Sequence, residues 1–112
     1  MKCTMKIIPH SIAATLLLVP HLGLCEEART LVIKEHRFHP ADVQVPAGQK
    51  IKLIVDNQDD DAEEFESHAL KVEKVIPGKS KGTVFVGPLK AGEYKFVGEF
   101  NEKTAKGVIV AK

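Results

Sequence analysis

The chain has 112 residues, of which 16 are Lys or Arg and 15 are Asp or Glu, so its formal net charge is +1. A length of this order predicts a single domain. The balanced charge, with no basic stripe interleaved with aromatic residues, argues against a nucleic-acid-binding protein. No Ser, Cys or His lies in the signature of an activated nucleophile, which argues against hydrolases of that type.

The first 25 residues have the parts of a secretory signal. Lys2 and Lys6 give a basic start, residues 12–19 are apolar, and small residues precede an acidic pair. The apolar run is too short to span a bilayer, which takes about 20 residues. We therefore expect a signal peptide cleaved after Cys25, export to the periplasm, and a mature domain of residues 26–112. A lipoprotein acylated at Cys25 is the alternative.

This cleavage would change the composition and the charge of the chain. The mature domain would have 87 residues, with 14 Lys and Arg against 15 Asp and Glu, a formal charge of −1. Both cysteines and both methionines lie in the removed segment. An exported domain of this size without a disulfide has to rely on its own core, and a bound metal or partner would add stability.

Strand patterns dominate the rest of the chain. Apolar and polar residues alternate in short runs, which are separated by turn formers such as Pro46-Ala47-Gly48. The expected strands are residues 30–34, 42–45, 50–55, 67–73, 83–86, 93–96 and 107–111. About seven short strands at this spacing predict an all-β, antiparallel Greek-key sandwich. Aromatic side chains should supply much of its core: Phe38, Phe65, Phe85, Tyr94, Phe96 and Phe100.

One segment interrupts the strand pattern. Residues 56–66 contain seven acids and no base, which is too polar and self-repelling for a buried strand. We expect a loop here, with room for one helical turn at residues 62–65, and a solvated run of Asp59, Asp60 and Asp61. The loop leads into a strand on which His68 shares a face with Leu70 and Val72.

The mature sequence resembles a known family. Residues 38–48, the strand 51–57 that ends in Asn, and the closing hairpin 92–112 are similar to exported cupredoxin-like domains. Glu64-Phe-Glu-Ser67, followed by Glu73-Lys74, looks like the EfeO-type cupredoxin-like proteins that accompany bacterial high-affinity iron permeases. The resemblance implies a cupredoxin-like domain over residues 26–112. It also implies periplasmic handling of ferrous iron, with an inner-membrane iron permease or another uptake component as partner.

The closing hairpin departs from blue-copper proteins of this fold, whose corresponding loop supplies a Cys, a His and usually a Met. Residues 98–103 contain none of the three. A type 1 copper centre needs a thiolate, so we do not expect one here. Asn101 stands where His is expected in relatives, and Asn is a poor replacement ligand.

Carboxylates on two loops are the candidate metal ligands. The cupredoxin layout would bring Glu64, Glu66 and His68 towards Glu99 and Asn101 at one end of the sandwich. Such an oxygen-rich set suits iron and other hard cations, and copper is the second candidate. Glu73 is added because the family motif contains it. The expected metal residues are therefore Glu66, His68, Glu99, Glu64 and Glu73.

Each candidate also has an ordinary structural interpretation. Glu64 and Glu66 can face solvent on either side of an anchoring Phe65, His68 can be a hydrogen-bonded core residue, and Glu73 can pair with a lysine. A copper site made of His36, His39 and a carboxylate has little support from spacing alone.

Three functions fit these patterns. The first is a metal-binding accessory protein of iron uptake, without catalysis of its own. The second is a ferroxidase acting with copper or within a complex, since anionic oxygen ligands favour the ferric state. The third is a metal-free scaffold for protein interaction. A homodimer facing two acidic loops across one metal would complete a thin ligand set.

Overall fold

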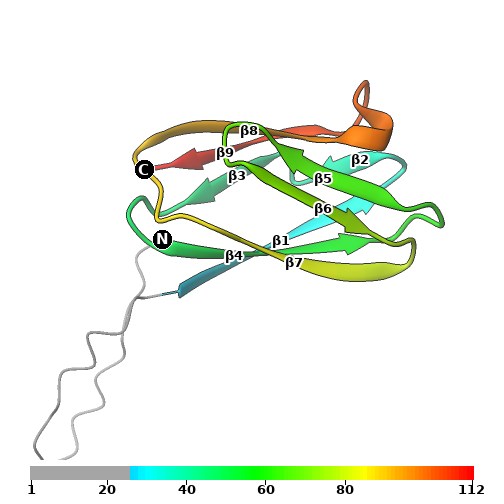
Figure 1. Cartoon of the computed structure of the whole chain (residues 1–112), viewed down its shortest axis with the longest axis horizontal. Coiled ribbons are helices and arrows are strands. Elements are labelled where there is room, and N and C mark those ends of the chain that lie inside the picture. Colours follow the sequence, from blue (N-terminus) through cyan, green and yellow to red (C-terminus); the bar gives the residue numbers. More distant parts are fainter. Residues whose placement is uncertain (1–25) are drawn as a thin grey trace, which may run out of the picture.

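The computed structural model describes residues 26–112, so the expected signal peptide and the cleavage site at Cys25 lie outside the described residues. The described part is all β apart from one 3₁₀ turn, η1 (Figure 1). Its strands are β1 (Glu26–Lys34), β2 (Arg37–His39), β3 (Asp42–Val45), β4 (Lys50–Asn57), β5 (Glu63–Ser67), β6 (Val72–Ile76), β7 (Ser80–Val86), β8 (Gly92–Gly98) and β9 (Lys106–Ala111), with η1 (Glu99–Asn101) between the last two. Among these residues no helix is both long and apolar enough to cross a bilayer.

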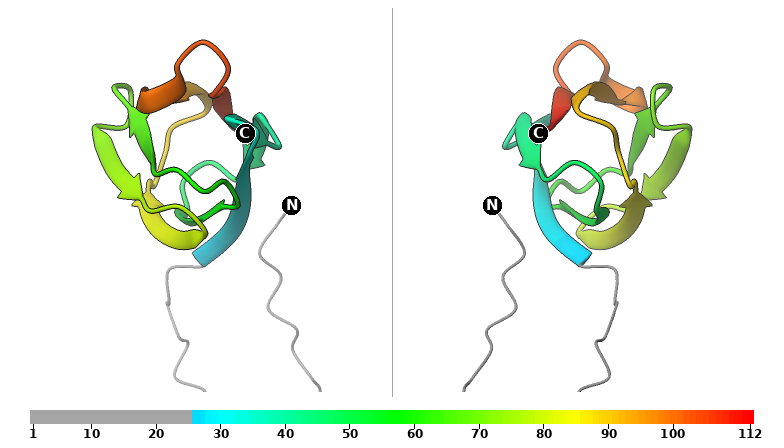
Figure 2. Two further views of the ribbon diagram at one scale, coloured as in Figure 1. Left: turned by 90° about the vertical axis from the view of Figure 1, so that its right-hand side faces the viewer. Right: turned by 90° about the vertical axis from the view of Figure 1, so that its left-hand side faces the viewer.

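Two sheets form the sandwich. One has the strand order β2-β1-β4-β7 and the other β3-β9-β8-β5-β6. Viewed along the long axis of the molecule, they enclose the core as two layers (Figure 2). Each sheet contains one parallel pair, β1 with β4 and β3 with β9. The predicted all-β sandwich is therefore confirmed, with nine strands rather than about seven and with mixed rather than purely antiparallel sheets.

Period-2 alternation places the core between the sheets. In β4, Ile51, Leu53 and Val55 are fully buried, while the residues between them are half-buried on the outer side. Phe38, Phe65 and Phe96 form an aromatic cluster, with ring centroids 5.0 to 6.1 Å apart. The buried apolar side chains of the described part are Phe, Leu, Ile, Val and Ala, and none carries sulfur.

Two of the aromatic residues expected in the core lie on the surface. Phe85 is 52% exposed and Phe100 is 54% exposed. Phe85 points outward because β7 alternates, with Val84 and Val86 taking the inward positions. Phe100 lies in η1, where no residue is buried. Tyr94 packs against the core from a half-buried position.

The acidic segment folds differently from the prediction. The loop between β4 and β5 covers only residues 58–62, and residues 63–67 form β5, not a loop or helical turn. The strand expected over residues 67–73 is also wrong, because residues 68–71 make the turn between β5 and β6. Lys71 in that turn has φ 55°, a left-handed conformation that a continuous strand could not contain.

Candidate functional site

The direction of each side chain on β5 decides the geometry of the acidic residues. Glu63, Phe65 and Ser67 point into the sandwich, with exposures of 1%, 0% and 2%. By alternation, Glu64 and Glu66 point to the outer face of the sheet. The strand therefore presents one carboxylate to the interior of the molecule and two to the outer side of the sheet, where neighbouring side chains leave Glu66 only 6% exposed.

The outward carboxylates meet glutamates from two other elements. Glu66 lies directly opposite Glu73 in the pairing of β5 with β6. Glu64 lies beside Glu99, the first residue of η1, because the preceding residue Gly98 pairs with Phe65. The structure thus gathers four of the predicted residues on one patch of the outer face. We call Glu64, Glu66, Glu73 and Glu99 the glutamate cluster.

Proximity of these acids changes their protonation. The hydrogen bond with Glu99 raises the pKa of Glu64 to about 7, with smaller contributions from burial and from the charges of Glu99, Glu73 and Glu66. Burial raises the pKa of Glu66, and Glu99 adds to the shift by charge and by hydrogen bonding, while His68 opposes it. Burial and the closeness of other acids both disfavour the ionised form of a carboxyl group. Near neutral pH the cluster therefore holds a proton that isolated glutamates would release.

His68 joins the edge of the cluster. Its Nε2 lies 3.3 Å from Oε1 of Glu66, and its side chain is 91% exposed. It does not share an apolar face with Leu70 and Val72, because it lies in the turn after β5. An exposed imidazole beside a buried carboxylate is open to solvent and to ligands.

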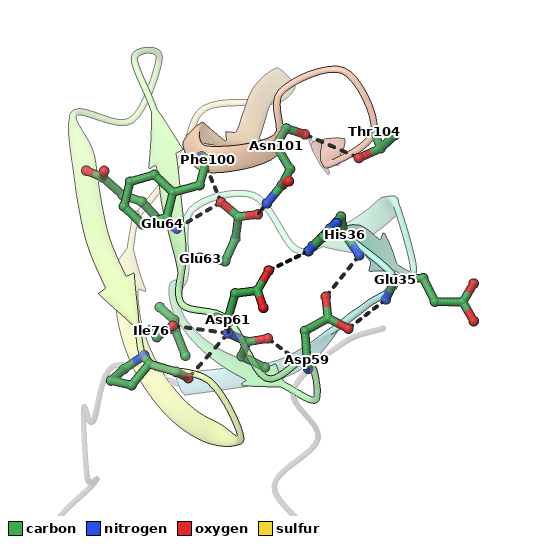
Figure 3. Close-up of polar contacts among 12 residues, drawn as sticks. Glu35, His36, Asp59, Asp61, Glu63, Glu64, Ile76, Phe100, Asn101 and Thr104 are labelled. Carbon is green, nitrogen blue, oxygen red and sulfur yellow. Dashed lines mark hydrogen bonds and ion pairs between the residues drawn. The ribbon is translucent and has the colours of Figure 1, made fainter.

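Glu63 is the residue that the sequence did not single out. Its Oε1 accepts hydrogen bonds from the backbone N–H of Phe100 at 2.9 Å and of Glu64 at 3.0 Å. Its Oε2 accepts one from Nδ2 of Asn101 at 2.6 Å (Figure 3). Three N–H donors satisfy a carboxylate that is taken out of water. Glu63 therefore ties β5 to η1, which carries Glu99 into the glutamate cluster.

Asn101 has a different neighbour from the one predicted. The sequence placed it beside Glu64 and Glu66, but its amide donates inward to Glu63. Gly98 leaves room for this contact, since a Cβ there would lie 2.7 Å from the carboxyl carbon of Glu63 and 2.7 Å from the Cβ of Ala105. Asn101 is thus a structural partner of Glu63 in the hairpin loop.

A second set of polar contacts, centred on Asp59, lies at the same end of the sandwich as Glu63. Asp59 accepts the N–H groups of Glu35 and His36 at 2.8 and 2.9 Å, closing the left-handed turn between β1 and β2. Burial would raise the pKa of Asp59, but these two N–H donors outweigh it and hold the pKa below its usual value. Asp59 is therefore a turn-closing residue as well as a member of the loop.

His36 contacts a carboxylate of the β4–β5 loop. Its Nε2 lies 3.0 Å from Oδ2 of Asp61 (Figure 3), and this contact raises the pKa of His36. His39 ends β2 with an exposed side chain. The structure thus pairs His36 with an acid from the β4–β5 loop.

The donor set decides which metals fit. Residues 26–112 contain no Cys or Met, so a type 1 copper centre does not fit this domain. Within this described range, no three His, Asp or Glu side chains already converge as metal ligands. The glutamate cluster is a crowded oxygen-donor patch, in which the exposed Glu73 and Glu99 have room to turn.

Comparison with known proteins agrees with this architecture. A family model described as a cupredoxin-like domain matches residues 10–111. An uncharacterized protein of Rickettsia prowazekii (strain Madrid E) is 44% identical over 80 residues, which cover 71% of this chain and 64% of that protein. The chain thus spans less than two thirds of the length of this relative.

Solved structures share the fold at low sequence identity. One is the metal-binding domain of a Cu(I)-exporting P-type ATPase from Streptococcus pneumoniae, with a TM-score of 0.67 and 15% identity, covering 78% of this chain and 86% of that one. Another is auracyanin A, a blue copper protein from Chloroflexus aurantiacus, with a TM-score of 0.67 and 14% identity, covering 78% of this chain and 99% of that one. The family match and the sandwich agree, and the chain belongs to the family of cupredoxin-like domains.

Proposed function

We propose that this protein is an exported metal-binding accessory protein of ferrous iron uptake. In this proposal the glutamate cluster holds iron as cargo, and the protein passes it to an inner-membrane permease. Support comes from the donor chemistry, from the EfeO-like Glu-Phe-Glu-Ser motif at residues 64–67, and from a fold that other proteins use to bind copper.

The crowding of the carboxylates carries the proposal. Glu64 lies beside Glu99 and Glu66 lies opposite Glu73, so four acids are crowded on one patch. A cation placed among them would replace the retained proton and relieve the repulsion. Carboxylate oxygens are ligands that iron and other hard cations accept. His68 would add one nitrogen donor from the adjoining turn.

Anaerobic calorimetry tests the site. The full chain is titrated with ferrous iron and with cupric ion, beside Glu66→Gln and Glu99→Gln. Each substitution should weaken binding at least about tenfold, or about 1.4 kcal/mol. Glu93→Gln is the matched control, because it removes one charge from the same face outside the cluster. Equal weakening in all three variants would reduce the effect to net charge and overturn the proposal.

Proton release gives a second, independent readout. Because the cluster retains a proton near neutral pH, metal binding there should displace it. Titrations in two buffers of different ionisation enthalpy should then give different apparent enthalpies at pH 7. Glu64→Gln should remove the difference. A wild-type enthalpy that is identical in both buffers would place any bound metal elsewhere.

A further inference from the structure

The outer faces of the two sheets carry opposite charge. On the sheet β3-β9-β8-β5-β6, alternation and register direct five acids outward against two lysines, Lys95 and Lys106, and Glu99 joins these acids from η1. The five strand acids are Asp42, Glu64, Glu66, Glu73 and Glu93. The whole described domain has nearly balanced charge, so this excess has to be offset on another surface.

The outer face of the other sheet carries the positive charge that balances these acids. Five bases point outward from β2-β1-β4-β7 and form what we call the basic face: Lys34, Arg37, Lys50, Lys52 and Lys81. The register places only two acids on the same side, Glu26 at the start of β1 and Asp56 near the end of β4. His39 lies there as well. Opposite charges are thus sorted onto opposite sides of one sandwich.

An exposed aromatic ring lies within the basic face. Phe85 is 52% exposed on β7, where it pairs directly with Lys52 on β4. The ammonium of Lys50 lies 4.7 Å from the centre of its ring. A half-exposed ring flanked by two lysines combines an apolar body with charges that stay in water. Aromatic and basic side chains are combined in this way at membrane–water interfaces.

The distribution of the charges favours a lipid surface over a single acidic group. The bases come from four neighbouring strands, which together span about 15 Å at the usual strand spacing. They are spread over the sheet, as the phosphates of a headgroup layer are spread over a bilayer. The acids of the opposite face lie beyond the core, about a Debye length away, so salt screens much of their repulsion from such a layer.

We propose that the basic face docks on an anionic phospholipid bilayer through these five bases and Phe85. This orientation turns the opposite, acidic face away from the lipid. The proposal is independent of metal binding, because it uses none of the residues of the glutamate cluster.

Vesicle flotation tests the docking. The full chain is mixed with vesicles of phosphatidylcholine alone or with added phosphatidylglycerol. The measured quantity is the difference in vesicle-bound protein between the two lipid compositions. Lys52→Gln with Lys81→Gln should lower the difference roughly tenfold. The matched pair Lys95→Gln with Lys106→Gln removes the same charge from the acidic face and should leave the difference within about twofold. Raising the salt concentration should weaken the binding of the wild-type protein to anionic vesicles more than the binding of the lysine variants.

Phe85→Ser tests the aromatic contribution. It should lower partitioning into anionic vesicles with the salt dependence kept, whereas Val75→Ser, at a 51% exposed position of the other sheet, should have no effect. Equal loss in both lysine pairs, or no preference of the wild-type chain for anionic vesicles, would overturn the proposal. In the second case an acidic protein would be the remaining partner for this face.

Discussion

Glu63 shows how one carboxylate can organise a site without belonging to it. It is 1% exposed and accepts N–H groups from Glu64, Phe100 and Asn101. Two of these donors lie in η1, which follows β8 in the chain. The inward Glu63 therefore fixes the element that delivers Glu99 to the outer face, where Glu64 meets it.

The stability of the domain should depend on Glu63. Glu63→Ala leaves buried N–H donors without an acceptor and should lower the free energy of unfolding by about 3 kcal/mol. Glu63→Gln keeps one acceptor, and the Asn101 amide can turn over to accept from the new amide, so the loss should be about 1 kcal/mol. Urea denaturation followed by circular dichroism measures both. Similar losses in the two variants would contradict the role of the carboxyl oxygens.

The raised pKa of Glu64 makes stability depend on pH. Its ordinary pKa is 4.5 and its folded pKa is about 7, so the folded state binds more protons than the unfolded state between these values. This contribution to stability is present at low pH and is lost as the pH rises through about 7. Thermal melts from pH 4.5 to 8 should therefore show the wild type losing stability relative to Glu64→Gln.

A control separates this effect from other titrations. His36 also has a raised pKa, and its contribution is likewise lost as the pH rises through its folded pKa. Subtracting the Glu64→Gln curve cancels that contribution, because His36 is present in both proteins. The stability of the control variant Glu93→Gln should change with pH as that of the wild type does. A difference curve that stays flat with pH would show that Glu64 and Glu99 do not share a proton.

Among the elements, the β4–β5 loop is secured by the last residue of β4. Asn57 is fully buried, and its Nδ2 donates to the carbonyls of Asp61 and Ile76 at 2.8 and 3.1 Å. Its Oδ1 accepts the N–H of Asp59 at 3.1 Å. One amide thus connects the end of β4, the acidic loop and the end of β6.

Substitutions at Asn57 should separate hydrogen bonding from size. Asn57→Asp keeps the shape but places an acceptor against two carbonyls, so it should cost at least as much as Asn57→Ala, about 2 kcal/mol or more. Gln58→Ala, at the exposed next position, should change the free energy of unfolding by less than about 0.5 kcal/mol. Guanidinium unfolding of the three variants provides the comparison. An Asn57→Asp variant as stable as wild type would contradict this account.

The strands that could be predicted are those whose pattern is local. Alternation identified β4 and β8, and β-rich runs identified β1, β7 and β9, because each shows its buried residues in its own sequence. The local pattern failed to predict β5, because the inward residues of this strand include Glu63. A buried acid on a strand is stabilised by donors 37 and 38 residues away in sequence, which no local pattern reveals.

The candidate site was predicted in part. The layout of the family placed Glu64 and Glu66 near Glu99, and the structure brings these side chains together with Glu73. The same layout gave Asn101 the wrong neighbour, because it could not tell which residues of β5 face inward. A one-residue change in that assignment moves every side chain to the other face.

For the whole molecule, metal binding should appear as thermal stabilisation. A cation that binds only the folded state at about a hundred times its dissociation constant adds about 2.7 kcal/mol. Anaerobic melts with excess ferrous iron should therefore show a higher Tm for the wild type and little change for Glu66→Gln. The same shift in both proteins would indicate binding outside the glutamate cluster.

The composition of the core has a consequence for a protein that meets redox-active metals. Peroxide turns Met into a sulfoxide and thiolates into sulfenic acids, and either change places a polar atom where packing needs an apolar one. Residues 26–112 offer neither target, since the interior is built from Phe and aliphatic side chains. In the proposed role, iron held on the outside of this domain would generate oxidants without exposing a sulfur atom of residues 26–112 to them.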